Sequence, residues 1–109
     1  MPVILKFRNG TLTAYIKGDI DHHTVPEIRD IIDEGFVAAE STQTLVLDFS
    51  DVTFMDSSGV GLVMGRYRLA AGKGKKLRVD NLSRRDCLIM KMSGIEKLAE
   101  INQRKEAGK

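Results

Sequence analysis

The chain has 109 residues, of which 42% are hydrophobic, and 17 basic against 15 acidic side chains give a net charge of +2. This length fits one domain, and the nearly balanced charge argues against a general nucleic-acid binder. The single cysteine, Cys87, excludes an internal disulfide and a cysteine-cluster metal site. Because no signal-like segment and no apolar run of about 18 residues occurs, we expect a soluble cytoplasmic protein without a membrane span.

Two runs of alternating apolar and polar residues open the chain, at 3–8 and 11–17. Asn9 and Gly10 lie between them. An Asn-Gly pair is typical of a two-residue hairpin turn because both turn residues must adopt positive φ. The sequence therefore predicts a β-hairpin at the amino terminus.

A helix is predicted next. Thr24 and Glu27 have capping-box spacing, and Pro26 fits the first helical turn, where backbone amides lack partners. Apolar residues then recur at steps of three and four, which predicts one buried face. The predicted face consists of Ile28, Ile31, Ile32, Phe36 and Ala39.

The segment TLVLDFS, residues 44–50, is almost continuously apolar from Leu45 to Phe49. A short run of this kind is typical of a central parallel strand that is buried on both faces. A second helix is expected from about Ser57 to Gly72. Its predicted apolar face consists of Val60, Val63, Met64, Tyr67 and Ala71.

The segment KKLRVDNL predicts a further strand, after which Ser83 and Asp86 have the spacing of a helix cap. The helix that they open should stop at Gly94, and IEKLAEI is compatible with a short strand or a helical turn. Strands that alternate with helices indicate an α/β domain over residues 1–102, followed by a polar tail at 103–109. We expect a four- or five-stranded mixed sheet with helices packed mainly on one side.

The sequence DSSG, Asp56 to Gly59, separates the buried strand from the second helix. Asp56 or Ser57 can serve as the N-cap of that helix. A hydrolase nucleophile at Ser57 would need glycine two residues earlier, where Met55 stands. The following glycines read G-x-G-x-x-x-G, which fits neither the dinucleotide fingerprint nor a P-loop. We therefore predict no catalytic residue and no intrinsic cofactor.

Ser57, Gly61, Gly65 and Arg68 are spaced at four, four and three, so they share one stripe of the second helix. The stripe is interpreted either as a close helix–sheet contact or as a docking surface for a partner's backbone. His22 and His23 are adjacent and should point in different directions, which argues against a chelating pair. The basic residues at 73–85, including Arg84 and Arg85, are interpreted as a solvated surface.

Three segments together resemble the STAS-domain anti-anti-sigma factors: GDIDHHT, LVLDFSDVTFMDSSGVGLVMGRYR and MSGIEKL. The resemblance covers nearly the whole chain. It implies a sporulation-type transcription regulator that works by partner switching and is not an enzyme. Its dephosphorylated form would bind an anti-sigma factor with serine kinase activity and so free a sigma factor. That kinase uses ATP to modify the antagonist, and a serine phosphatase reverses the step.

The family motif places the phosphorylated serine directly after the aspartate, which is Ser57 here, and Asp21 matches a family contact to the anti-sigma factor. Asp56, Ser58 and the stripe residues complete the predicted partner surface. Free amides at the helix N-terminus would let the protein tolerate phosphate without unfolding. The alternative is a STAS module that serves as a scaffold or weak nucleotide-binding sensor without a phosphorylation switch. Neither interpretation involves nucleic acid or membrane as a partner.

Overall fold

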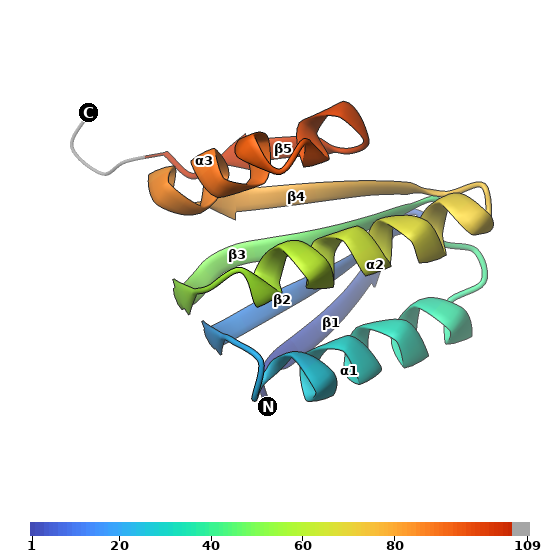
Figure 1. Cartoon of the computed structure of the whole chain (residues 1–109). Helices are drawn as coiled ribbons and strands as arrows, with labels where there is room; N and C mark the ends of the chain where they lie inside the picture. Colours follow the sequence, from blue (N-terminus) through green and yellow to red (C-terminus); the bar gives the residue numbers. More distant parts are fainter. Residues whose placement is uncertain (106–109) are drawn as a thin grey trace.

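The computed structural model describes residues 1–105, and Figure 1 shows helices layered on one twisted sheet. The elements are β1 Val3–Arg8, β2 Thr11–Ile20, α1 Val25–Ala38, β3 Thr44–Met55, α2 Ser58–Gly72, β4 Lys76–Leu82, α3 Arg84–Met92, the 3-10 turn η1 Ile95–Lys97 and β5 Glu100–Gln103. Among these residues, no helix is both long enough and apolar enough to cross a membrane.

The amino-terminal hairpin is confirmed. β1 and β2 pair antiparallel from Val3 opposite Ile16 to Arg8 opposite Thr11. Asn9 has a φ of 49° and Gly10 a φ of 79°. The turn therefore uses the positive φ angles that Asn-Gly adopts most readily.

The sheet has five strands in the order β1-β2-β3-β4-β5, so every strand lies beside its predecessor in the chain. All pairs after the first are parallel, which confirms the mixed α/β sheet. β3 extends to Met55, beyond the predicted segment 44–50. Its ladder with β4 ends where Asp48 lies opposite Asp80, so the last part of β3 is paired with β2 alone.

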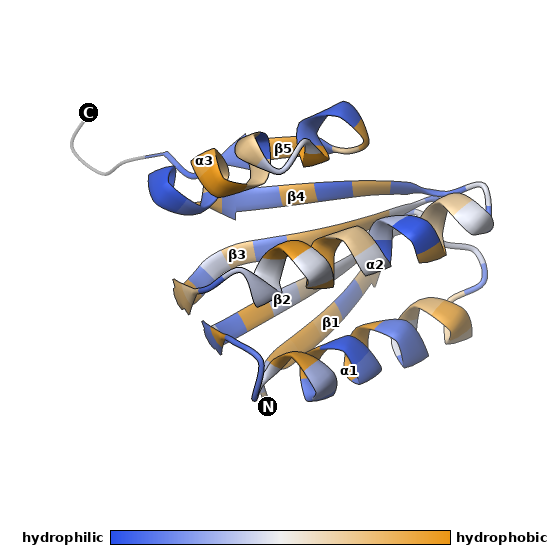
Figure 2. Cartoon of the chain, in the orientation of Figure 1, coloured by the Kyte–Doolittle hydropathy of each residue, from blue (hydrophilic) through white to orange (hydrophobic). Residues whose placement is uncertain are grey.

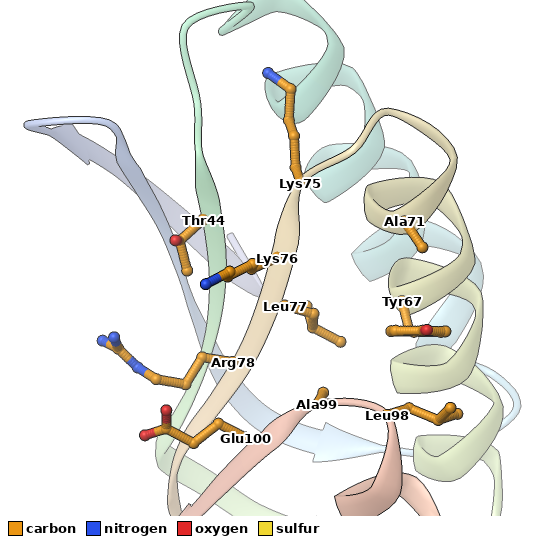
Figure 3. Close-up of a pocket in the computed structure, with 10 residues that line it drawn as sticks. All are labelled: Thr44, Tyr67, Ala71, Lys75, Lys76, Leu77, Arg78, Leu98, Ala99 and Glu100. Atoms are coloured by element: carbon orange, nitrogen blue, oxygen red, sulfur yellow. The ribbon is translucent and has the colours of Figure 1, made fainter.

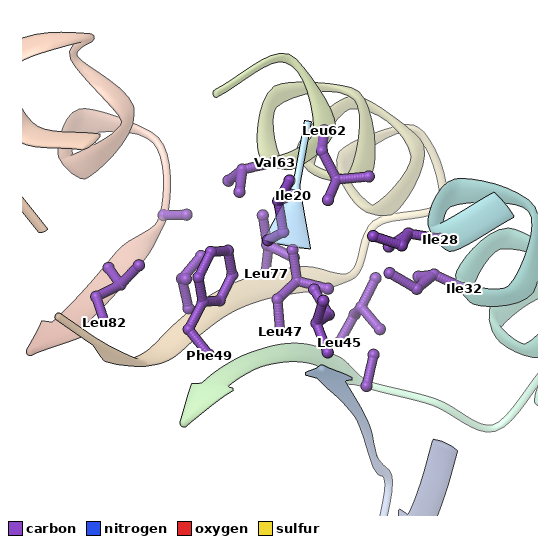
Figure 4. Packing of buried hydrophobic residues seen from close by; sticks show 14 of the residues in the cluster. Ile20, Ile28, Ile32, Leu45, Leu47, Phe49, Leu62, Val63, Leu77 and Leu82 are labelled. Carbon is purple, nitrogen blue, oxygen red and sulfur yellow. The ribbon is translucent and has the colours of Figure 1, made fainter. Parts of the chain in front are cut away.

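One hydrophobic core fills the space between the helices and one face of the sheet (Figure 4). Leu45, Leu47 and Phe49 of β3 are fully buried in its centre. Figure 2 shows hydrophobic and hydrophilic positions interspersed along the helices, and the buried ones include Ile28 and Ile32 of α1 and Leu62 of α2. The predicted packing of helices on one side is thus confirmed, and the core fixes where the strand ends lie.

Helix α1 buries Ile28, Ile32 and Phe36, as its periodicity predicts. The predicted capping box at its start is wrong, because the Thr24 side chain accepts no hydrogen bond from the helix. Asp21 instead orders the turn that precedes the helix, since its Oδ1 accepts hydrogen bonds from the amides of His23 and Thr24 at 2.8 and 3.0 Å.

The apolar face predicted for α2 is confirmed in part. Val63 lies in the core and Val60, Met64 and Tyr67 pack partly buried against it, whereas Ala71 is exposed. The fully buried positions also include Gly59, Leu62, Arg66 and Ala70, which the prediction missed. The buried face of α2 is turned relative to the predicted face, so that it includes a charged side chain. Arg66 lies 2.8 Å from Asp33 of α1, in an ion pair between the two helices.

The carboxyl-terminal part is better ordered than a polar tail suggests. Ser83 caps α3 by accepting a hydrogen bond from the Asp86 amide at 3.0 Å, as predicted. The ambiguous segment IEKLAEI contains both predicted forms, the turn η1 and the start of β5. Gln103 belongs to β5, and the Arg104 guanidinium donates to the carbonyls of Asn81 and Phe49. Residues 106–109 of the predicted tail lie outside the described part.

Candidate functional site

The parallel strands bring the predicted site residues to one end of the sheet. Ile20 and Met55 are paired at the carboxyl ends of β2 and β3, and the Asp56 amide donates to the Ile20 carbonyl at 3.1 Å. Adjacent strands lie about 4.8 Å apart. The residues that follow, Asp21 and Asp56, therefore leave the sheet from neighbouring positions, and Ser57 directly follows Asp56.

Ser57 and Ser58 have different surroundings. Ser57 is exposed, and as the N-cap residue of α2 its side chain makes no capping hydrogen bond. The cap is provided by Asp56, whose Oδ1 accepts from the Ser58 amide at 2.7 Å. Ser58 is half-buried within the first turn. Ser57 is thus the more exposed of the two serines.

The first turn of α2 has few open amides. The Gly59 amide donates to the Asp56 carbonyl at 3.0 Å, and the Val60 amide donates to the Ser57 carbonyl at 3.1 Å. Together with the capped amide of Ser58, these groups already have acceptors. The expectation of free amides at this helix N-terminus is therefore wrong for these positions.

Asp21 occupies a rigid loop. The amides of Thr24 and His23 donate to its Oδ1, and these hydrogen bonds hold the pKa of Asp21 below its usual value. Its own amide donates to the Thr24 hydroxyl at 3.0 Å. The carboxylate is therefore charged at neutral pH and fixed in position beside Asp56.

The two adjacent histidines were expected to point in different directions, which is wrong. The ring centroids of His22 and His23 lie 3.9 Å apart, at a tilt of 38°. Both residues are exposed. They form a small aromatic surface directly after Asp21.

Both glycines of the stripe have open space beside them, and the closely packed glycine of this helix is Gly59. A Cβ at Gly61 or Gly65 would meet no atom within 4 Å, whereas a Cβ at Gly59 would lie 2.3 Å from the Met55 sulfur. Close packing therefore requires Gly59, which lies outside the stripe. Gly61 and Arg68 are exposed and Gly65 is half-buried. The stripe is therefore an accessible strip of helix surface that begins at Ser57 and has no side chains at its two glycines.

Arg85 is a neighbour of the site that sequence reasoning missed. Its Nη1 donates to the Met55 carbonyl at 2.9 Å, and its guanidinium carbon lies 5.9 Å from the centre of the Phe54 ring. In the sequence Arg85 is one of several basic residues interpreted as solvated. Its place near the site could have been predicted from its position in the sequence just after β4, because the parallel strand β4 ends at the same end of the sheet as Ser57.

Figure 3 shows a pocket at the opposite end of the sheet, near the starts of β3, β4 and β5. It has a volume of about 460 Å³. Tyr67, Leu77 and Leu98 lie between β4 and α2, whereas Lys76, Arg78 and Glu100 point to the other side of the strand. The charged groups thus do not converge on the apolar part of this pocket.

Comparisons with known proteins agree with the fold. The family model described as STAS domain matches residues 2–107. An anti-sigma F factor antagonist from Paenibacillus polymyxa is 31% identical over 101 residues, covering 93% of this chain and 86% of the relative.

Two solved structures are also similar. The anti-sigma factor antagonist SpoIIAA in its unphosphorylated form has a TM-score of 0.75 at 29% identity, covering 91% of this chain and 86% of that one. The Bacillus cell fate determinant SpoIIAA in the phosphorylated form has a TM-score of 0.70 at 29% identity, covering 91% and 89%. This chain therefore belongs to the STAS domain family, in the group that includes the anti-sigma factor antagonists.

Proposed function

We propose that this protein is an anti-sigma factor antagonist that is switched off by phosphorylation of Ser57. In its unmodified form it binds an anti-sigma factor with serine kinase activity, which releases a sigma factor. The kinase then transfers phosphate from ATP to the Ser57 hydroxyl, and a serine phosphatase restores the binding form. The observation that carries the proposal is the exposed, uncapped hydroxyl of Ser57 at a rigid strand–helix junction.

Rigidity around Ser57 supports its role as a substrate. The preceding strand is anchored by Met55, which is fully buried, and Gly59 packs directly against that side chain. Asp56 fixes the turn through its hydrogen bond to Ser58. A kinase therefore meets the hydroxyl in one geometry, without the entropic cost of ordering a loop.

The charge of the phosphate explains how the switch works. Phosphorylation adds a charge of roughly −1.5 to −2 at neutral pH. The charge lies beside the carboxylates of Asp21 and Asp56, in the surface that contacts the partner. At a docked interface it loses water, and a cost of about 3 kcal/mol weakens binding roughly 100-fold, since each 1.4 kcal/mol is tenfold.

The test combines phosphate mapping with affinity measurements. Purified protein is incubated with candidate kinase-type anti-sigma factors and ATP, and the modified residue is identified by mass spectrometry. We expect phosphate on Ser57 in the wild type and in Ser58→Ala, and none in Ser57→Ala. By calorimetry, Ser57→Ala should bind the anti-sigma factor, whereas Ser57→Asp and the phosphorylated protein should bind at least tenfold more weakly.

Two results would refute the proposal. One is phosphate that maps to Ser58, and the other is equal affinity of the modified and unmodified forms. The absence of both binding and phosphorylation with every kinase tested would favour a STAS scaffold or a nucleotide-binding sensor.

A further inference from the structure

A phosphate on Ser57 enters an acidic part of the surface. Asp56 precedes it, Asp21 follows the neighbouring strand, and Asp19 accepts a hydrogen bond from Thr53 across that strand pair at 2.9 Å. The amides of the first α2 turn already have acceptors. A compensating charge for the phosphate must therefore come from a side chain.

Arg85 is the cation that contacts the segment carrying Ser57. The Met55–Asp56 peptide group is held from both sides: its N–H donates to the Ile20 carbonyl, and its C=O accepts from Arg85 Nη1 at 2.9 Å. Two residues of extended chain span at most about 7 Å. The guanidinium is therefore anchored close to the backbone of Ser57.

The guanidinium retains donors for a second acceptor. Nη1 serves the Met55 carbonyl and the Asp86 carboxylate, while Nε and Nη2 have no hydrogen-bond partner within residues 1–105. The Phe54 ring lies 5.9 Å from the guanidinium carbon. A cation–π contact of this kind uses none of the hydrogen-bond donors of the group, so Nε and Nη2 can still bind oxygen atoms.

Exposure gives Arg85 the freedom to turn toward the phosphate. Its side chain is 62% exposed, and Asp86, its ion-pair partner at 3.2 Å, is almost fully buried. Arg84, its neighbour in sequence, is also exposed but makes no hydrogen bond to β3 in the described part of the chain. Arg84 thus provides a control with equal charge and a different position.

We propose that Arg85 binds the phosphate of phosphorylated Ser57 and so stabilises the inactive form of the protein. The pairing uses the Nε and Nη2 edge of the guanidinium, which matches the oxygen atoms of a phosphate. The inference rests on the proposed modification of Ser57, and it adds the residue that holds the product of that reaction. The charged or titratable residues at this end of the sheet are Asp19, Asp21, His22, His23, Asp56, Arg84, Arg85 and Asp86.

The second pKa of the phosphate, about 6 for a free phosphoserine, provides a direct readout. Phosphoserine is inserted at position 57 during protein synthesis, and the phosphorus NMR shift is followed against pH. A nearby cation favours the doubly charged phosphate and lowers its pKa. We expect Arg85→Ala to raise this pKa by roughly half a unit or more, and Arg84→Ala to change it much less. His22 and His23 are present in every variant, so they do not affect the comparison.

A third variant separates binding from structural support. Arg85→Gln can still donate to the Met55 carbonyl but carries no charge, so it should raise the phosphate pKa as Arg85→Ala does. The inference is overturned if Arg85→Ala leaves the pKa unchanged, if Arg84→Ala shifts it equally, or if Arg85→Gln behaves like the wild type. Because no kinase is used, these outcomes are independent of the one that would refute the proposed function, which is failure of a kinase to modify Ser57.

Discussion

The two glycines of the α2 stripe should be replaceable by alanine with a gain in stability. A glycine inside a helix costs about 0.8–1 kcal/mol relative to alanine, because the unfolded chain loses more freedom on folding. A Cβ at Gly61 or Gly65 meets no atom within 4 Å, so no steric cost offsets this gain. We expect each variant to raise the free energy of unfolding by about 0.5–1 kcal/mol, or the Tm by about 3–6 °C.

Gly59→Ala should have the opposite effect. Its Cβ would lie 2.3 Å from the sulfur and 2.4 Å from Cγ of Met55, a side chain with no exposed surface. Repacking a full core around an added carbon costs about 1–3 kcal/mol. This cost equals or exceeds the helix-propensity gain, so we expect a net loss of about 1 kcal/mol.

Urea unfolding followed by circular dichroism measures all three variants on one scale. The midpoints should move upward for Gly61→Ala and Gly65→Ala and downward for Gly59→Ala, with unchanged m-values. A destabilised Gly61→Ala or Gly65→Ala would show that the stripe packs internally. A Gly59→Ala variant as stable as the wild type would show that Met55 moves aside at little cost.

The remaining predictions concern charge and docking. Asp21→Asn should slow association with the anti-sigma factor and reduce its salt dependence, measured by stopped flow; equal rates would exclude a charged contact. Because the folded pKa of Asp21 lies below 3.8, its carboxylate stabilises the fold above that pH, and the difference from Asp21→Asn in unfolding experiments should vanish as the pH falls through the folded pKa. Arg66→Ala should lower the free energy of unfolding, measured in urea, by about 2–4 kcal/mol, and the exposed control Arg68→Ala by less than about 0.5 kcal/mol. Equal losses in the two variants would contradict a stabilising role of the Arg66–Asp33 ion pair. Gly61→Glu should stay folded by circular dichroism yet bind the anti-sigma factor more weakly by calorimetry, and undiminished affinity would refute the docking surface.

Local patterns determine most of the fold, which is why the strands and helices could be predicted. The hairpin follows from alternation around Asn9-Gly10, and β3 from its run of apolar residues. Its extension to Met55 was less visible, because irregular pairing with β2 at two points breaks the alternation there. A β-bulge changes which side chains face the core, so a simple period of two no longer describes the segment.

The predictions that failed for α1 and α2 failed because the interactions involve residues that are distant in the sequence or lie outside the helix. Arg66 is buried because Asp33 of another helix neutralises it, and a helical pattern alone places arginine at the surface. The helix starts differ from the predicted caps for a similar reason. Asp21 and Asp56, which precede the N-cap residues Thr24 and Ser57, accept hydrogen bonds from the amides of Thr24 and Ser58, and the side chains of Thr24 and Ser57 make no capping hydrogen bond. Arg85 was missed because its acceptor, the Met55 carbonyl, has no signature in the sequence.

The uninterrupted strand order has a consequence for the kind of ligand this end of the sheet can take. In open α/β sheets, nucleotides bind in the crevice where the strand order reverses and neighbouring crossovers leave in opposite directions. Here the order β1-β2-β3-β4-β5 never reverses, so successive crossovers run in one direction and place their helices on the same face. Without such a topological switch point, the loops after β2 and β3 do not flank the kind of crevice in which such sheets bind nucleotides. This arrangement agrees with the proposed role, in which another protein binds at this end of the sheet.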